Sequence, residues 1–178
     1  MSAKKVASAD EQKKAAALEA LKLVKSGMNL GLGTGSTANH FIRGLGEQVK
    51  QGLEVKGVPT SKATADLAKE LGIPLTTLGE HPFLDLCIDG ADEFDPELRL
   101  IKGGGGALLI EKIVATSAKD VVIITDESKR VKVLGQFPLP IEVVNMGIKA
   151  TAWKIERVFR MLGMNPKMTL RARDGQMF

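Results

Sequence analysis

The chain has 178 residues, 44% of them hydrophobic, which is typical of a globular protein with one ordinary domain and a small appendage. Its net charge of +4 suits an acidic small-molecule substrate, whereas an aromatic content of 4% and the lack of a basic–aromatic run disfavour nucleic acid. The single cysteine, Cys87, excludes an internal disulfide and a CxxC site. Residues 1–10 lack the apolar core of a signal peptide and no stretch is long enough to span a bilayer, so we expect a cytoplasmic protein without nucleic-acid or membrane partners.

Strands alternate with helices through the first two thirds of the chain. Ser8 to Glu11 matches a capping box at the start of a helix that Gly27 ends. The pattern then predicts, in order, a strand at 28–32, a helix at 38–50, a strand at 53–58, a helix at 61–71 ended by Gly72, strands at 75–78 and 84–89, a helix at 107–117, and a central parallel strand at 121–125. The expected fold is α/β: a Rossmann-like parallel sheet with flanking helices, and ligands at the carboxyl ends of the strands.

The pattern changes near Pro138, and a smaller α+β domain is expected to follow. We predict a strand at 141–144, a helix at 151–162 and a strand at 168–173, followed by Asp174-Gly175, a strong hairpin turn signal. Only three residues follow this turn, so we expect no returning strand and a small domain that is truncated at the C-terminus. Residues 1–137 are assigned to the α/β catalytic domain and 138–178 to this partial domain.

A glycine turn, Gly33-Thr34-Gly35-Ser36-Thr37-Ala38, lies between the first strand and the next helix. Its glycines let a ligand approach the backbone, and the helix N-terminus with the Ser36 and Thr37 hydroxyls offers donors. The turn therefore predicts an anion site, with phosphate as the expected anion. It also matches the nucleotide-binding pattern GxGxxA, but a Rossmann domain needs an acidic residue after the next strand and residues 58–62 contain none. The alternative that this segment is only a tight turn, without a ligand, remains.

Carboxylates follow the apolar strand at 84–88, in the segment Asp89-Gly90-Ala91-Asp92-Glu93. Such groups are costly to bury unless they are paired or functional. A metal site is disfavoured, because both histidines are distant in sequence and Asp89, Asp92 and Asp95 lack calcium-loop spacing. A solvated acidic turn remains the alternative.

Lys102 precedes four glycines, Gly103 to Gly106, and Glu111 lies on the following helix. Four glycines in a row make sense where a ligand must lie against bare backbone, with Lys102 supplying a cation. Glu111 taken alone would be a surface helix carboxylate paired with Lys112 or a neighbour. With the aspartates these residues suit proton transfer beside a carbonyl, which needs one carboxylate base and cationic donors for the enediolate.

The combination resembles the type A ribose-5-phosphate isomerases. The resemblance rests on GTGSTA at 33–38, DGADE at 89–93, KGGGGA at 102–107 with Glu111-Lys112, and DESK at 126–129, and it runs from about Ala9 to Asn165. It implies interconversion of D-ribose 5-phosphate and D-ribulose 5-phosphate in the non-oxidative pentose phosphate pathway, without metal or organic cofactor, by a homodimer or tetramer. It also implies that family members continue beyond the position of Phe178.

The resemblance further assigns roles to residues. Glu111 is the general base between C1 and C2, Lys102 and the following glycine amides stabilise the enediolate oxygen, and Asp89 and Asp92 bind sugar hydroxyls and assist ring opening. The implied substrate-binding set is Thr34, Gly35, Ser36, Thr37, Asp89, Gly90, Ala91, Asp92, Lys102, Gly103, Gly104 and Gly105, with Lys13 and Lys129 as phosphate partners and no metal ligands.

Two other functions stay open from the sequence. A sugar-phosphate-binding regulatory domain without catalysis shares this general architecture, but it would have no need of Glu111. An NAD(P)-dependent oxidoreductase is weakened by the missing acidic residue after the second strand.

Overall fold

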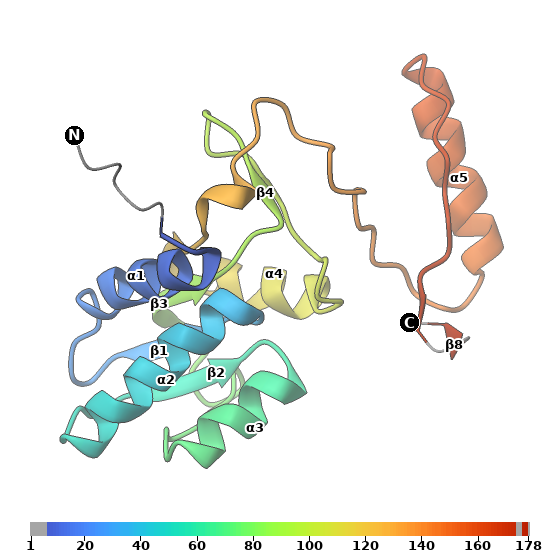
Figure 1. The fold of residues 1–178 in the computed structure, drawn as a ribbon. Coiled ribbons are helices and arrows are strands. Elements are labelled where there is room, and N and C mark those ends of the chain that lie inside the picture. The colour runs from blue at the N-terminus through green and yellow to red at the C-terminus, as the bar shows by residue number, and fades with distance from the viewer. Residues whose placement is uncertain (1–6, 174–175, 178) are drawn as a thin grey trace, which may run out of the picture. The chain divides into compact units, whose positions relative to one another are not determined.

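A computed structural model describes residues 7–173 and 176–177. The chain divides into two compact units, Met1–Pro140 and Ile141–Phe178 (Figure 1). The helices of the first unit are α1 (Ala9–Leu21), α2 (Ser36–Lys50), α3 (Lys62–Glu70), α4 (Leu108–Thr116) and the 3₁₀ helix η1 (Glu127–Lys129). Its strands are β1 (Asn29–Leu32), β2 (Lys56–Pro59), β3 (Leu84–Asp89), β4 (Glu93–Phe94), β5 (Leu100–Ile101) and β6 (Ala118–Ile123). Among the described residues, no helix has the length and apolar character needed to cross a membrane.

Four strands form a parallel sheet in the order β2-β1-β3-β6. The chain leaves β1 toward β2 on one side, whereas β3 pairs on the other side of β1, so the strand order reverses between β1 and β3. Ligands of open α/β sheets bind at such a switch point, outside the carboxyl ends of the strands. The predicted α/β fold with flanking helices is confirmed.

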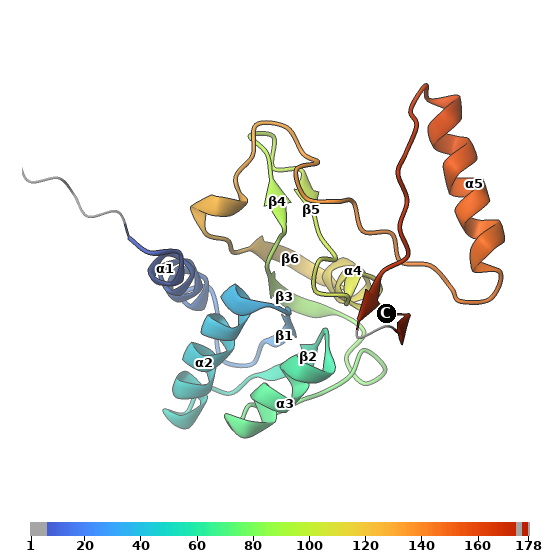
Figure 2. The same ribbon diagram turned by 45° about the vertical axis from the view of Figure 1, so that its right-hand side comes forward.

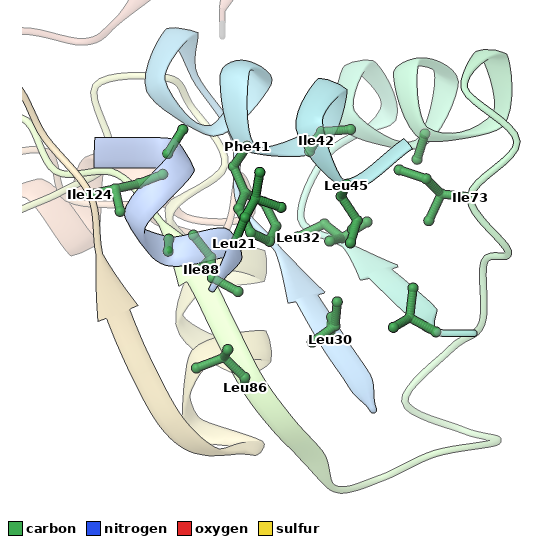
Figure 3. Close-up of a cluster of buried hydrophobic side chains, with 14 residues drawn as sticks. Leu21, Leu30, Leu32, Phe41, Ile42, Leu45, Ile73, Leu86, Ile88 and Ile124 are labelled. Atoms are coloured by element: carbon green, nitrogen blue, oxygen red, sulfur yellow. The ribbon is translucent and has the colours of Figure 1, made fainter. Parts of the chain in front are cut away.

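Alternation along the central strands builds a core on each face of the sheet. Leu30, Leu32, Leu86 and Ile88 point to the face that α1 and α2 cover (Figure 3). The residues between them face α4, where a Cβ on Gly31 would lie 2.7 Å from Val114 Cγ1, so α4 can approach only because this residue is glycine.

Cys87 lies on the α4 face of β3 and is fully buried. Burial raises the pKa of its thiol to about 12. The predicted small buried strand residue is confirmed.

Local signals fixed several helix ends correctly. Ser8 and Glu11 form the predicted capping box, and Ser61 caps α3, after which Gly72 takes a φ of +74°. Gly27 does not end α1, which stops at Leu21; it serves the turn into β1 with a φ of +91°.

Several strand predictions were wrong in extent or position. The strand expected at 121–125 begins at Ala118 and lies at the edge of the sheet, where Val121 is 46% exposed, because an apolar β-branched run does not distinguish a central strand from an uncovered edge. The strand expected at 53–58 is Lys56–Pro59, and that at 75–78 is reduced to one bridge between Leu75 and Gly57. The antiparallel pair β4–β5 was not predicted (Figure 2).

The second unit holds α5 (Ile148–Met161) and a short antiparallel pair, β7 (Ala172–Arg173) and β8 (Gln176–Met177). The expectation that no strand returns was wrong: β8 pairs with β7, although residues 174–175, the predicted turn, lie outside the described residues. The strand expected at 168–173 shrinks to its last two residues. No strand forms at 141–144, where Ile141 and Val144 are exposed, because an apolar β-branched run alone does not supply a neighbouring strand to pair with.

Candidate active site

The loops that follow β1 and β3 meet at the switch point. Gly33 donates its N–H to Ile88 O at 2.9 Å, and Thr34 N donates to Asp89 Oδ1 at 3.1 Å. A Cβ on Gly33 would lie 2.2 Å from Asp89 Oδ1, so only glycine allows the two loops to touch. Two motifs that are 55 residues apart in sequence therefore form one surface.

A pocket opens at this junction and collects most of the predicted site residues. It is lined by Thr34, Gly35, Ser36, Thr37, Ala38, Gly90, Ala91, Asp92, Lys102, Gly103, Gly105, Glu111 and Lys129. Asp89, Gly104 and Lys13 belong to the predicted set but do not line it. Ala38 lines the pocket although the prediction left it out; it closes the GTGSTA motif, which was the available signal.

Lys102 stands at the centre of a charged cluster. Its ammonium donates to Asp89 Oδ2 at 2.9 Å and to Gly90 O at 2.7 Å, and it lies 3.1 Å from Glu111 Oε2. Burial opposes the charged form, but the two carboxylates outweigh burial and raise the pKa of Lys102. Lys102 therefore stays protonated in a largely enclosed position, as a donor to a developing oxyanion must.

Glu111 lies in the first turn of α4 and is 4% exposed, so the alternative of a surface carboxylate paired with Lys112 is wrong. Its Oε2 forms an ion pair with the Lys102 ammonium at 3.1 Å but has no hydrogen-bond partner of normal geometry among the residues that the structure describes. Burial and the neighbouring Asp89 charge raise the pKa of Glu111, although Lys102 opposes them. A buried carboxylate oxygen with an open acceptor position and a raised pKa can take up and return a proton.

The glycine tetrad packs against Asp92. Gly104 N donates to Asp92 Oδ2 at 2.7 Å, and a Cβ on Gly104 would lie 2.3 Å from Asp92 Oδ1. Gly103 and Gly106 have φ of +101° and +82°, in the left-handed region that favours glycine. Close approach and backbone conformation thus account for glycine at 103, 104 and 106.

Asp89 is 1% exposed and turned into the protein. Its Oδ1 accepts from Thr34 N and from Gly90 N at 2.8 Å, and its Oδ2 accepts from Lys102. The solvated acidic turn considered from the sequence is therefore wrong for this residue. Its contacts hold Lys102 and the Gly33 loop in place.

The two predicted phosphate partners differ in position. Lys129, on η1, lines the pocket, whereas Lys13 lies 3.9 Å from Asp126 Oδ2 and outside the lining. Asp126 is 3% exposed and accepts from Ser128 N at 2.9 Å. Burial alone would raise the pKa of Asp126, but the Ser128 hydrogen bonds and the two lysines hold it below its usual value.

No group of three or more His, Cys, Asp or Glu side chains arranged to hold a metal ion occurs within residues 7–173 and 176–177. Independence from metal therefore stays a prediction for experiment.

Comparison with known proteins identifies the family. The profile of the family "Ribose 5-phosphate isomerase A (phosphoriboisomerase A)" matches residues 56–178. A ribose-5-phosphate isomerase A from Parvibaculum lavamentivorans is 61% identical over 164 residues, which are 92% of this chain and 71% of that protein.

Solved structures agree. A ribose 5-phosphate isomerase from Plasmodium falciparum superposes with a TM-score of 0.88 at 40% identity, over 95% of this chain and 73% of that one. A D-ribose-5-phosphate isomerase in complex with phospho-erythronic acid gives a TM-score of 0.81 at 43% identity, over 86% of this chain and 68% of the other. The chain belongs to the ribose-5-phosphate isomerase A family, whose members are isomerases.

Proposed function

We propose that this chain interconverts D-ribose 5-phosphate and D-ribulose 5-phosphate through an enediolate, with Glu111 as the general base. The observation that carries the proposal is the Oε2 of Glu111, which is buried 3.1 Å from the Lys102 ammonium and makes no hydrogen bond of normal geometry to the described residues. A base that must exchange a proton with carbon needs a carboxylate oxygen that protein hydrogen bonds do not saturate.

In the proposed reaction, Glu111 removes the proton from C2 of the open-chain aldose. The C–H electrons form the C1–C2 double bond, and the carbonyl π electrons move to O1, which becomes an oxyanion. Two N–H bonds of Lys102 go to Asp89 and Gly90, and the third faces Glu111 Oε2 at 3.1 Å; in the proposal this third proton turns to the oxyanion when substrate binds. The backbone N–H of Gly105, which lines the pocket, is proposed as a second donor. The hydroxyl proton of O2 then passes to O1, the O2 electrons form the C2 carbonyl, and the electrons of the C1–C2 double bond take the proton back from Glu111 at C1. The step is redox-neutral and needs no cofactor.

The phosphate is proposed to lie at residues 34–37 and Lys129. Gly35 is the N-cap of α2 and supplies no side-chain cap, so the first N–H groups of α2 can serve a ligand. Ser36 is exposed at this end and Lys129 lines the same pocket, which suits a phosphate dianion. Lys13 lies 3.9 Å from Asp126 Oδ2 and outside the pocket lining. In this proposal it attracts the phosphate by its positive charge at longer range, without a direct hydrogen bond.

Asp92 is proposed to bind a sugar hydroxyl, because it lines the pocket with one oxygen committed to Gly104. The related protein solved with phospho-erythronic acid supports this substrate class. That acid combines a phosphate with a planar carboxylate, which has the shape and charge of an enediolate.

The test is to add ribose 5-phosphate to the purified chain, without NAD(P) and after EDTA treatment, and to follow ketose formation. We expect turnover, with competitive inhibition by phospho-erythronic acid. Binding of the sugar phosphate without turnover would favour the regulatory domain, turnover only with NAD(P) would favour the oxidoreductase, and loss of activity restored by a divalent cation would overturn the metal-free mechanism.

Three broader assignments remain proposals. We assign residues 1–137 to the catalytic domain and 138–178 to part of a second domain, and we place the protein in the cytoplasm, where a free thiol such as Cys87 stays reduced. Self-association as a dimer or tetramer is supported by three half-exposed apolar side chains on α4, Leu109, Ile110 and Ile113. A chain that is purely monomeric in sedimentation equilibrium would overturn the last assignment.

A further inference from the structure

Four hydroxyl groups, those of Thr34, Thr60, Ser61 and Thr64, meet beside the Gly33–Thr37 loop. Thr34 Oγ1 donates to Ser61 Oγ at 2.9 Å, Ser61 Oγ donates to Thr64 Oγ1 at 3.1 Å, and Thr64 Oγ1 donates to Gly33 O at 3.0 Å. Because Gly33 and Thr34 are neighbours, these bonds form a ring that starts and ends on the same loop. We call the side chains of Thr34, Thr60, Ser61 and Thr64 the hydroxyl ring.

Thr60 braces this ring from the strand side. Its Oγ1 lies 2.7 Å from Thr34 Oγ1 and donates to Leu32 O at 3.1 Å. Thr60 and Thr64 are 0% and 1% exposed, so water does not compete for these bonds. Ser61 also caps α3 by accepting from Thr64 N at 3.1 Å, which fixes the ring to the start of a helix.

The Thr34 hydroxyl can donate only one hydrogen bond, so its acceptor decides whether it can also donate to a ligand. A hydroxyl carries one proton, and the acceptors within reach of the Thr34 proton are Thr60 Oγ1 at 2.7 Å and Ser61 Oγ at 2.9 Å, which both belong to the ring. The methyl group of Thr34 points the other way: a Cβ placed on Gly105 would lie 3.8 Å from Thr34 Cγ2. Thr34 therefore presents a methyl group and its backbone to the pocket and keeps its donor inside the ring.

The loop is held from its other side as well. Thr34 N donates to Asp89 Oδ1, and Asp89 also holds Lys102. The hydroxyl ring and Asp89 thus fix the backbone of Gly33 and Thr34 between them, immediately before the N-terminus of α2. None of Thr60, Ser61 and Thr64 lines the pocket.

We propose that Thr60, Ser61 and Thr64 are positioning residues that set the phosphate-binding conformation of residues 34–37, and that the Thr34 hydroxyl serves the hydroxyl ring rather than the substrate. This inference rests on the proposed function, because it assumes that a sugar phosphate binds at this loop. It extends the site to residues about 25–30 positions away in sequence, none of which lines the pocket.

The test uses Thr64→Val, which keeps the side-chain shape but removes the acceptor for Ser61 and the donor for Gly33 O. Losing buried hydrogen bonds of this kind is expected to raise both the KM for ribose 5-phosphate and the inhibition constant of inorganic phosphate at least about fivefold. The kcat is expected to fall less, because Glu111 and Lys102 keep their geometry. Thr64→Ser restores the hydroxyl and is expected to bring both constants back toward those of the wild type.

Thr76→Val is the matched control. Thr76 is a 7% exposed threonine that donates to Glu80 Oε2 at 2.8 Å and does not line the pocket. Removing its hydroxyl also costs a hydrogen bond, but it is expected to leave KM and phosphate inhibition unchanged. This control separates a general loss of stability from a change in the loop.

A double-mutant cycle of Thr34→Val and Thr64→Val separates the two roles of Thr34. If both act through the ring, the double variant is expected to lose little more phosphate affinity than either single variant. Additive losses would mean that the Thr34 hydroxyl contacts the substrate itself, and unchanged constants in Thr64→Val, or equal losses in Thr64→Val and Thr64→Ser, would overturn the positioning role. A wild-type chain that binds phosphate but forms no ketose would contradict the proposed reaction and leave the phosphate measurements as the test of the ring.

Discussion

Glu111→Gln removes the proton acceptor while keeping the size of the side chain. A positioned base contributes about 10²–10⁴-fold, which corresponds to roughly 2.7–5.4 kcal/mol of barrier at 1.36 kcal/mol per tenfold. The neighbouring carboxylates are poor substitutes, because Asp89 already accepts three hydrogen bonds and Asp92 accepts one from Gly104 N. We therefore expect a kcat loss in the upper half of this range, about 10³–10⁴-fold.

Substrate affinity and stability are expected to survive the same substitution. Lys102 keeps its bonds to Asp89 and Gly90, so the charged cluster remains connected. The folded-state pKa of Glu111 is raised, so the folded protein binds the proton more tightly than the unfolded chain. The stability that this protonation contributes is fully present below the unfolded pKa of 4.5 and is lost as the pH rises through the folded-state pKa. At pH 7 the uncharged glutamine is thus expected to keep or raise the melting temperature.

The assay is continuous ketose formation at saturating ribose 5-phosphate, with binding of the sugar phosphate measured by calorimetry. Glu111→Asp is the informative companion, because it keeps the carboxylate but withdraws it by one methylene. Glu47→Gln is the control, since Glu47 is a helix glutamate 2.9 Å from a lysine but 63% exposed. A Glu111→Gln variant that keeps more than about a tenth of wild-type kcat, less than 1.4 kcal/mol of barrier, would refute Glu111 as the base.

Three further outcomes follow from the geometry. Lys102→Ala is expected to lower kcat about 10²–10³-fold and to change KM less, because the enediolate carries charge that the substrate lacks; a change confined to KM would make Lys102 a ground-state binder. The acidic limb of the kcat/KM profile should lie above pH 4.5, because burial raises the pKa of the base and activity is lost as it protonates; a limb at or below 4.5 contradicts this. Gly104→Ala forces a Cβ to within 2.3 Å of Asp92 Oδ1 and should lower kcat/KM in a folded protein, while Gly79→Ala, whose nearest contact would be 3.6 Å, should not, and equal activities would show that the glycine–aspartate contact is dispensable.

Motifs with a local physical cause were predictable from the sequence. The capping box at Ser8, the glycine after α3 and the apolar run of β3 depend on neighbours along the chain, and all three were confirmed. The location of the ligand residues at the carboxyl ends of the strands was also predictable, because parallel β–α units bring these ends to one edge, whereas the strand order that creates the switch point was not predicted.

What depended on distant partners could not be predicted. Whether a strand lies at the edge of the sheet, as β6 does, and whether a segment such as 141–144 forms a strand at all both depend on residues elsewhere in the chain, which a local pattern does not record. Within the candidate site the sequence indicated the residue types, but the inward orientation of Asp89 follows from three donors that come from separate segments.

The buried thiol of Cys87 can report how often the structure around β3 opens. It is the chain's single thiol, fully buried under α4 and two residues before Asp89, and with a pKa of about 12 it is almost entirely protonated at neutral pH. An alkylating reagent can therefore react only during excursions in which α4 or a neighbouring strand separates from β3. The rate of labelling measures how often those excursions occur. The ratio of the labelling rates without and with bound sugar phosphate would measure how far the ligand suppresses the opening of the sheet at β3.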